Sequence, residues 1–151
     1  MKYMDMVASE SLRKWSSAPF VDRLCTRDYV LATGDDGAEV TIDKGTVVFI
    51  PISGIHHDPR YYSDLERFGE SARDNITPGT YLPFGIGPRN CIGSRFALME
   101  LKAIVYHLLL EFSFERCPET QVLPQLAKGF MGLRLEKGIQ IEFRPRRPLS
   151  R

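Results

Sequence analysis

Residues 84–93 read Phe84-Gly85-Ile86-Gly87-Pro88-Arg89-Asn90-Cys91-Ile92-Gly93, and this stretch decides how the chain is interpreted. One cysteine stands among glycines and a proline, two residues after an arginine and directly before a long apolar segment. A thiolate forms at neutral pH when a cation or a helix N-terminus lies nearby. Glycines let the backbone turn sharply or approach a bulky flat cofactor. The stretch therefore predicts an activated cysteine that can ligate a metal.

The segment after the cysteine predicts a long helix. Apolar side chains recur at helical spacing and indicate a helix over about residues 92–111, at Leu101, Ile104, Val105, Leu108 and Phe112. Cys91 then lies just before the helix N-terminus, where free backbone amides and the helix dipole stabilise an anion. His107 falls within this apolar helix, and we expect it to be a core residue whose hydrogen bonds are satisfied.

Composition narrows the class of protein. The 151 residues carry a net charge of +1, which gives no argument for a nucleic-acid partner or an anionic membrane surface. The three cysteines are far apart and form no C-x-x-C pair, so a disulfide framework or a cysteine zinc site is not expected. The chain has no signal peptide and no run of eighteen apolar residues. It is long enough for one domain with a buried core.

The remaining pattern predicts an α+β fold. A helix is expected over residues 3–15, followed by strands at 29–32, 39–42 and 46–52 and by an irregular polar segment at 60–78. Alternating apolar residues on either side of Lys137-Gly138 predict a C-terminal β-hairpin, with Met131, Leu133 and Leu135 on one strand and Ile139, Ile141 and Phe143 on the other.

The cysteine loop resembles the haem-thiolate loop of the cytochrome P-450 monooxygenases. Its spacing, Phe-x-x-Gly-x-Arg-x-Cys-x-Gly, fills all five fixed positions of that loop, with Phe84, Gly87, Arg89, Cys91 and Gly93. The resemblance implies that the cofactor is haem b and that Cys91 is the axial ligand of its iron. Arg89 is expected to pair with a haem propionate, and Phe84 to cover the sulfur. Gly87 and Gly93 are expected to permit the turn and the close approach of the ring.

A second motif supports the resemblance. Glu10-Ser11-Leu12-Arg13 fits the Glu-x-x-Arg pair that the family carries on a helix, and the two charges are neighbours on a helix surface. In the family a further arginine, from a Pro-x-Arg-Phe motif, completes a buried network. The nearest match here is Leu65-Glu66-Arg67-Phe68, which has leucine in place of proline, and Arg67 is the candidate.

The segment after this helix also matches the family. Ala18-Pro19-Phe20-Val21-Asp22-Arg23 corresponds to a stretch that lines the distal pocket and supplies a basic residue to a propionate. Arg23 is the candidate for that residue, and the candidate pocket residues are Ala18, Phe20 and Val21. Around residues 10–26 and 81–100 the sequence is most similar to insect microsomal members.

The resemblance implies a haem-thiolate monooxygenase that inserts one oxygen atom from O2 into a small lipophilic substrate. Its electron donor would be NADPH-cytochrome reductase, at the cytosolic face of the endoplasmic reticulum membrane. Residues 1–151 are expected to form the C-terminal portion of a single cytochrome P-450 domain. That portion would hold the Glu-x-x-Arg helix, a small sheet, a meander, the cysteine loop, the long proximal helix and the hairpin. The membrane anchor and the oxygen-activating distal residues are expected elsewhere, so no catalytic residue is assigned here.

Two other interpretations stay open at this point. The chain could be a truncated haem-binding fragment without catalytic activity. It could also be an unrelated enzyme in which Cys91 is a nucleophile with a histidine as base, chosen from His56, His57 and His107.

Overall fold

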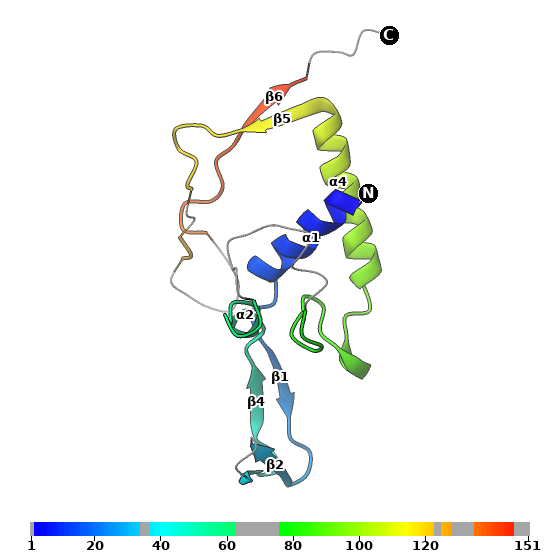
Figure 1. Cartoon of the computed structure of the whole chain (residues 1–151), viewed down its shortest axis with the longest axis vertical. Coiled ribbons are helices and arrows are strands. Elements are labelled where there is room, and N and C mark those ends of the chain that lie inside the picture. Colours follow the sequence, from blue (N-terminus) through cyan, green and yellow to red (C-terminus); the bar gives the residue numbers. More distant parts are fainter. Residues whose placement is uncertain (1, 34–36, 63–75, 123–124, 128–134, 147–151) are drawn as a thin grey trace.

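The structure is a computed structural model, and it describes residues 2–33, 37–62, 76–122, 125–127 and 135–146. Two long helices, α1 (Lys2–Lys14) and α4 (Ser94–Glu111), lie next to each other in the middle of the molecule (Figure 1). Within the described residues, six short strands pair into three two-stranded antiparallel sheets, and the sheets β1–β4 and β5–β6 lie at opposite ends of the helical part (Figure 1). The α+β character predicted from the sequence holds for the described residues.

Helix α1 confirms the helix expected at residues 3–15. Two of its side chains are buried, Ala8 and Arg13, and its last turn carries Arg13 and Lys14, whose charges interact favourably with the C-terminal end of the helix dipole. After Lys14 the chain turns away, and the Ser16 hydroxyl donates a hydrogen bond to the Ala18 carbonyl at 3.1 Å. This turn directs the following residues toward the cysteine loop.

The sheet next to the cysteine loop includes a strand that the sequence did not predict. Strand β1 (Val21–Leu24) pairs with β4 (Val47–Ile50), and Arg23 lies opposite Val48. Strands β2 (Tyr29–Thr33) and β3 (Ala38–Ile42) form a second pair, as expected. The strand predicted over 46–52 ends earlier, because Pro51 leads into the short helix α2 (Ile52–His56). Proline has no N–H to donate to a strand partner.

The C-terminal strand has a different partner from the one predicted. Strand β6 (Glu142–Pro145) pairs with β5 (Phe112–Glu115), which follows α4 directly, and Phe143 lies opposite Phe114. Leu135 forms an isolated bridge with Leu126. Met131 and Leu133 lie outside the described residues, so the first strand of the expected hairpin is described only at Leu135. The rings of Phe112 and Phe114 each pack edge-on against Phe143, which accounts for the pairing observed.

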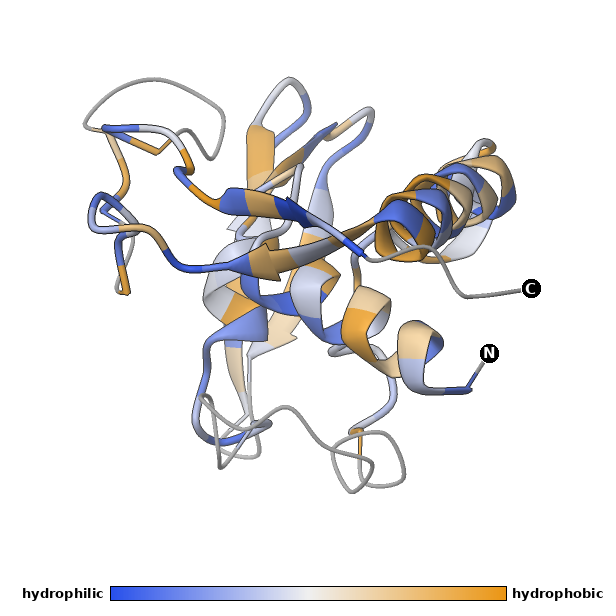
Figure 2. Cartoon of the chain, turned by 90° about the horizontal axis from the view of Figure 1, so that it is seen from above, coloured by the Kyte–Doolittle hydropathy of each residue, from blue (hydrophilic) through white to orange (hydrophobic). Residues whose placement is uncertain are grey.

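Helix α4 confirms the long helix expected after the cysteine, and it begins at Ser94. Its apolar residues face several sides, as Figure 2 shows, and none of its side chains is buried. Large apolar side chains on it are exposed, among them Phe96, Met99 and Ile104. The expectation for His107 was wrong, because this residue is exposed and its ring packs against that of its neighbour Tyr106.

The core lies where α1, α2 and the segment before the cysteine loop meet. The core contains both apolar and polar buried side chains. The apolar ones are Ala8, Ile52, Tyr62 and Leu82, and the polar ones are Arg13, Ser16, His56 and Thr80. Within the described part of the chain, no helix is long and apolar enough to cross a membrane.

Candidate functional site

The cysteine loop is closed by hydrogen bonds across its base. The Cys91 amide donates to the Phe84 carbonyl at 2.8 Å, and the Gly85 amide donates to the Leu82 carbonyl at 3.1 Å. Inside the loop, residues Gly87–Arg89 form one 3-10 turn, and the Asn90 amide donates to the Gly87 carbonyl. These bonds fix the position at which the chain returns, and therefore the position of Cys91.

The glycines of the loop have different roles. Gly87 has a φ of 75° and Gly85 a φ of 72°, a left-handed conformation that glycine adopts without the penalty other residues incur. Gly85 was not singled out from the sequence. Gly93 has an ordinary φ of −89°, so no sharp turn requires it. A Cβ at position 93 would lie 4.0 Å from the Cys91 sulfur, so this glycine leaves space beside the thiol.

Cys91 is exposed and lies at the start of α4. Gly93 is the N-cap of this helix, and its carbonyl accepts from the Ala97 amide at 2.9 Å. The Cys91 carbonyl accepts a longer hydrogen bond, 3.4 Å, from the Ser94 amide. The thiol is therefore next to the end of the helix at which unpaired amides and the dipole favour a negative charge.

A cavity of about 520 Å³ lies between this loop and the sheet formed by β1 and β4. Six of the residues singled out from the sequence line it: Ala18, Val21, Arg23, Phe84, Arg89 and Cys91. Apolar side chains complete much of the wall, from Ile50, Ile52, Leu82, Pro83 and Ile86. The cavity thus combines one thiol, two guanidinium groups and a mainly apolar surface.

Three other candidates are not among the residues that line this cavity. Phe20 packs edge-on against Phe49, with 5.5 Å between ring centroids. Gly87 and Gly93 contribute through the backbone of the loop, as described above. The strand conformation of β1 contributes to this arrangement, because Val21 and Arg23 are two residues apart and share the face of the sheet that lines the cavity.

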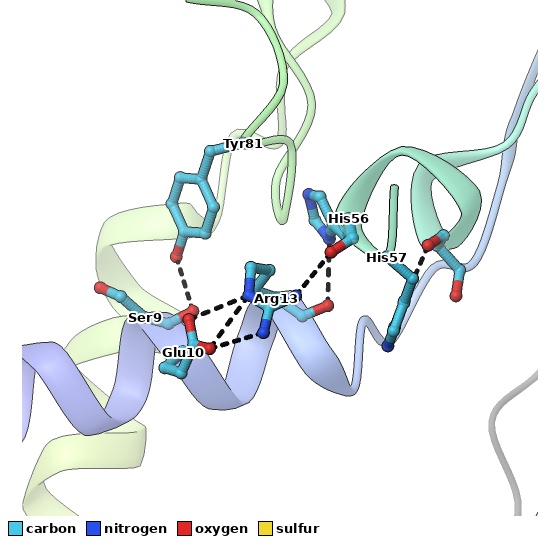
Figure 3. A network of polar contacts seen from close by, with 7 residues as sticks. Ser9, Glu10, Arg13, His56, His57 and Tyr81 are labelled. Carbon is cyan, nitrogen blue, oxygen red and sulfur yellow. Dashed lines mark hydrogen bonds and ion pairs between the residues drawn. The ribbon is translucent and has the colours of Figure 1, made fainter. Parts of the chain in front are cut away.

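The predicted Glu10–Arg13 pair is formed, and Figure 3 shows it at close range. Arg13 Nε donates to both carboxylate oxygens of Glu10, at 3.1 and 3.0 Å, and Arg13 Nη2 donates to Oε1 at 2.6 Å. The Arg13 side chain is 2% exposed and that of Glu10 is 12% exposed. This is a nearly dry ion pair with bidentate geometry, the arrangement in which such pairs are strongest. Arg67 lies outside the described residues.

A histidine that sequence reasoning did not place in this network belongs to it. Arg13 Nη1 donates to the His56 carbonyl at 2.6 Å, and His56 Nδ1 lies 3.2 Å from the Arg13 carbonyl. The Leu82 amide donates to His56 Nε2 at 2.8 Å. The Tyr81 ring stacks on that of His56, and its hydroxyl donates to the Ser9 carbonyl at 3.1 Å. The sequence signal was the His56-His57-Asp58-Pro59 stretch, which gave no indication of which histidine is buried.

His56 is fully buried, and its two backbone partners suit a neutral imidazole. Burial is the main cause that holds the pKa of His56 below its ordinary value of 6.5, and the hydrogen bond to the Arg13 carbonyl opposes this only in part. Both ring nitrogens are engaged by backbone groups, so His56 has no free nitrogen with which to act as base for Cys91. His57 is exposed and its Nδ1 lies 2.8 Å from the Ser53 carbonyl of its own helical turn. The geometry gives no support to a Cys–His nucleophile pair at either of these histidines.

Comparisons with known proteins identify the family to which this chain belongs. The sequence profile of the family described as Cytochrome P-450 matches residues 1–143. The chain belongs to the cytochrome P-450 family.

Individual relatives come from insects and mammals. The chain is 52% identical over 126 residues to Cytochrome P-450 9b2 of Drosophila melanogaster, an alignment that covers 80% of this chain and 25% of the relative. It is 46% identical over 143 residues to Cytochrome P-450 9e2 of Blattella germanica, and this alignment covers 91% of the chain and 26% of the relative. It is 46% identical over 133 residues to Cytochrome P-450 3A9 of Rattus norvegicus, and this alignment covers 85% of the chain and 25% of the relative. The chain spans about a quarter of the length of these curated relatives.

Proposed function

We propose that this chain supplies the thiolate-ligand side of a haem-dependent monooxygenase, with Cys91 as the axial ligand. The observation that carries the proposal is the exposed Cys91 thiol, which lines the same cavity as Arg23 and Arg89. The closed base of the loop and the adjacent N-terminus of α4 support the same role. Membership of the cytochrome P-450 family is consistent with it.

The residues of the cavity fit haem b. A thiolate is a soft ligand that binds haem iron, and two guanidinium groups suit the two carboxylates of the cofactor. The apolar wall around Phe84 and Leu82 suits the faces and edges of the macrocycle and excludes water. When bound to a thiolate, haem supplies the chemistry that activates O2 for insertion of one oxygen atom into a substrate.

Each residue has a separate part in this proposal. Cys91 would hold the iron, Arg89 and Arg23 would each hold a carboxylate, and Phe84 would shield the sulfur from solvent. Ala18 and Val21 lie on the cavity wall and would contact the cofactor or a substrate, and Phe20 would support this wall through its contact with Phe49. Gly87 and Gly93 would give the loop its path and leave space at the sulfur.

For the enzyme as a whole, we propose a small lipophilic substrate and NADPH-cytochrome reductase as electron donor. The proposed location is the endoplasmic reticulum membrane, with the site on the cytosolic side. We further propose that residues 1–151 belong to one structural domain together with the remaining cytochrome P-450 sequence. The mainly apolar wall of the cavity supports a lipophilic substrate over a strongly charged one.

The replacement Cys91→Ser tests the ligand assignment. In the natural full-length protein, reduced and treated with carbon monoxide, the Soret band is expected at the thiolate-ligated position, and Cys91→Ser is expected to abolish it. Cys25→Ser is the matched control, because Cys25 lies on the connection after β1, where its sulfur interacts with the Arg27 carbonyl. If Cys91→Ser retains the band, the assignment is wrong.

A turnover assay on the full-length protein and on this 151-residue chain separates the enzyme from the haem-binding fragment. With reductase and NADPH present, a monooxygenase consumes O2 and forms an oxygenated product in equal amounts. Haem uptake by this 151-residue chain with no product formed would favour the non-catalytic alternative, and turnover by it would exclude that alternative.

A further inference from the structure

We infer that His56 is a positioning residue for the cysteine loop. Its neutral imidazole links the Glu10–Arg13 ion pair to the backbone at Leu82, shortly before the loop. The inference rests on the proposed function of Cys91 as ligand, and it assigns a role to a residue outside the cavity and outside the thiolate motif.

The contacts form a short path from the ion pair to the thiol. The Leu82 amide donates a hydrogen bond to His56 Nε2, with 2.8 Å between the nitrogens, and the Leu82 carbonyl accepts one from the Gly85 amide. The intervening Phe84 holds the Cys91 amide through its carbonyl. His56 therefore fixes the first of the residues from which the loop is built. On its other side it is held by Arg13, which binds its carbonyl and faces its Nδ1.

The partners of His56 allow one protonation state. An amide can only donate, so Nε2 must carry a lone pair toward Leu82. A carbonyl can only accept, so Nδ1 must carry the proton toward Arg13. A second proton would place the imidazolium N–H against the Leu82 N–H and break that bond. The ring cannot move away easily, because it is fully buried between Tyr81, which stacks on it at 5.9 Å, and the edge of Tyr62 at 6.4 Å.

The charges around His56 also oppose its protonation. Burial lowers the pKa of His56 most, the positive charges of Arg13 on α1 and His57 on α2 lower it further, and Glu10 on α1 raises it. Tyr62 is neutral in the physiological range, since burial raises its pKa, and the Tyr81 hydroxyl is engaged by Ser9. When the loop detaches, His56 regains a pKa near 6.5. The detached form therefore binds more protons below about pH 6.5, and acid favours detachment, whereas above that pH this group contributes no pH dependence.

Three variants test this role in the full-length, haem-loaded protein. His56→Phe keeps a ring but offers no acceptor to Leu82, and the fraction of protein without the thiolate-ligated Soret band is expected to rise about tenfold, as the loss of one buried hydrogen bond implies. His56→Gln restores an acceptor that does not titrate, and it is expected to recover the band and to remove the step below pH 6.5. His57→Gln is the matched control, because His57 is exposed and its Nδ1 faces the Ser53 carbonyl of its own helical turn rather than the loop. It is expected to keep the wild-type band at pH 8 and to show a slightly smaller step below pH 6.5, because the charge of His57 lowers the pKa of His56.

The readout is the thiolate-ligated fraction measured between pH 5 and 8, with thermal unfolding recorded on the same samples. If His56→Phe and His56→Gln keep the wild-type fraction and the wild-type pH profile, the inference is overturned. If His56→Phe does not fold, the pH profile of His56→Gln decides alone. A wild-type protein without the band would overturn the proposed function and this inference together. A normal wild-type band with an unchanged variant overturns only this inference.

Discussion

The Glu10–Arg13–His56 network and the cysteine loop are neighbours, yet they are built in opposite ways. In the network Arg13 and His56 are buried and Glu10 is 12% exposed, and the Arg13 guanidinium contacts Glu10, the His56 carbonyl and the face of the Tyr62 ring. In the loop, residues 85–92 are exposed, and the path of the chain depends on backbone hydrogen bonds and on glycine conformations.

This difference shows how stability and chemistry are distributed in the chain. A buried charge is strongly destabilising when it loses its partner, so the network tolerates little change. The cysteine loop is exposed and includes glycines in a left-handed conformation, so its own contacts add little stability. Its position depends on the contacts that hold its base. We infer that the network positions the loop and that the loop offers the thiol, so changes in the two regions should have separable consequences.

The largest effect is expected from breaking the network. Arg13→Leu leaves the Glu10 carboxylate and the His56 carbonyl without their guanidinium partner, and the free energy of unfolding should fall by about 3–5 kcal/mol. Denaturant unfolding measures this. The matched control is Arg60→Gln, because Arg60 also forms a bidentate pair, with Asp58, but is exposed, and no measurable change is expected there. Equal losses in the two variants would contradict the distinction between a buried and an exposed pair.

A smaller effect is expected from the loop glycines. Gly87→Ala forces a side chain into a left-handed conformation and should cost about 1–2 kcal/mol of stability. Gly93→Ala has no such strain and places a methyl group in contact with the Cys91 sulfur, so it should change haem uptake more than stability. Unfolding curves and haem titration of both variants check this. If Gly93→Ala loses more stability than Gly87→Ala, the left-handed conformation at Gly87 does not determine the stability of the loop.

The smallest effect is expected from the cavity arginines. Arg23 and Arg89 are exposed, so Arg23→Gln and Arg89→Gln should each weaken haem binding by roughly two- to fivefold, as exposed ion pairs do. The effects should multiply in the double variant if each arginine holds its own carboxylate. Arg27→Gln, an exposed arginine that does not line the cavity, is the control. Rates of haem transfer to an acceptor protein measure the change, and an equal effect at Arg27 would indicate a general loss of positive charge.

Local features of this molecule were predictable from the sequence, and features that depend on distant contacts were not. Spacing along the chain indicated both long helices and the Glu10–Arg13 pair, because residues three or four apart share a helix face. The short motif around Cys91 indicated the loop and three of its residues that line the cavity, Phe84, Arg89 and Cys91.

The missed features involve partners far away in the chain. His56 is distinguished from His57 by contacts with Arg13, 43 residues away, and Leu82, 26 residues away. Strand β6 was given a partner across a nearby turn, whereas the aromatic contacts of Phe143 pair it with β5. Gly85 looked equivalent to its neighbours until its φ was known. Sequence pattern reports which face of an element is apolar, but it does not report which distant element covers that face.

The hydrogen bond between the Cys91 amide and the Phe84 carbonyl also constrains how the gene can change. It fixes the number of residues between these two positions. With one residue more or one fewer, the turns at Gly85 and Gly87 would no longer bring the Cys91 amide to the Phe84 carbonyl. Exposed side chains such as Ile86 can be exchanged while the bond persists. We therefore expect this loop to accept point replacements at exposed positions and to reject insertions and deletions, so that its length is inherited more strictly than its composition.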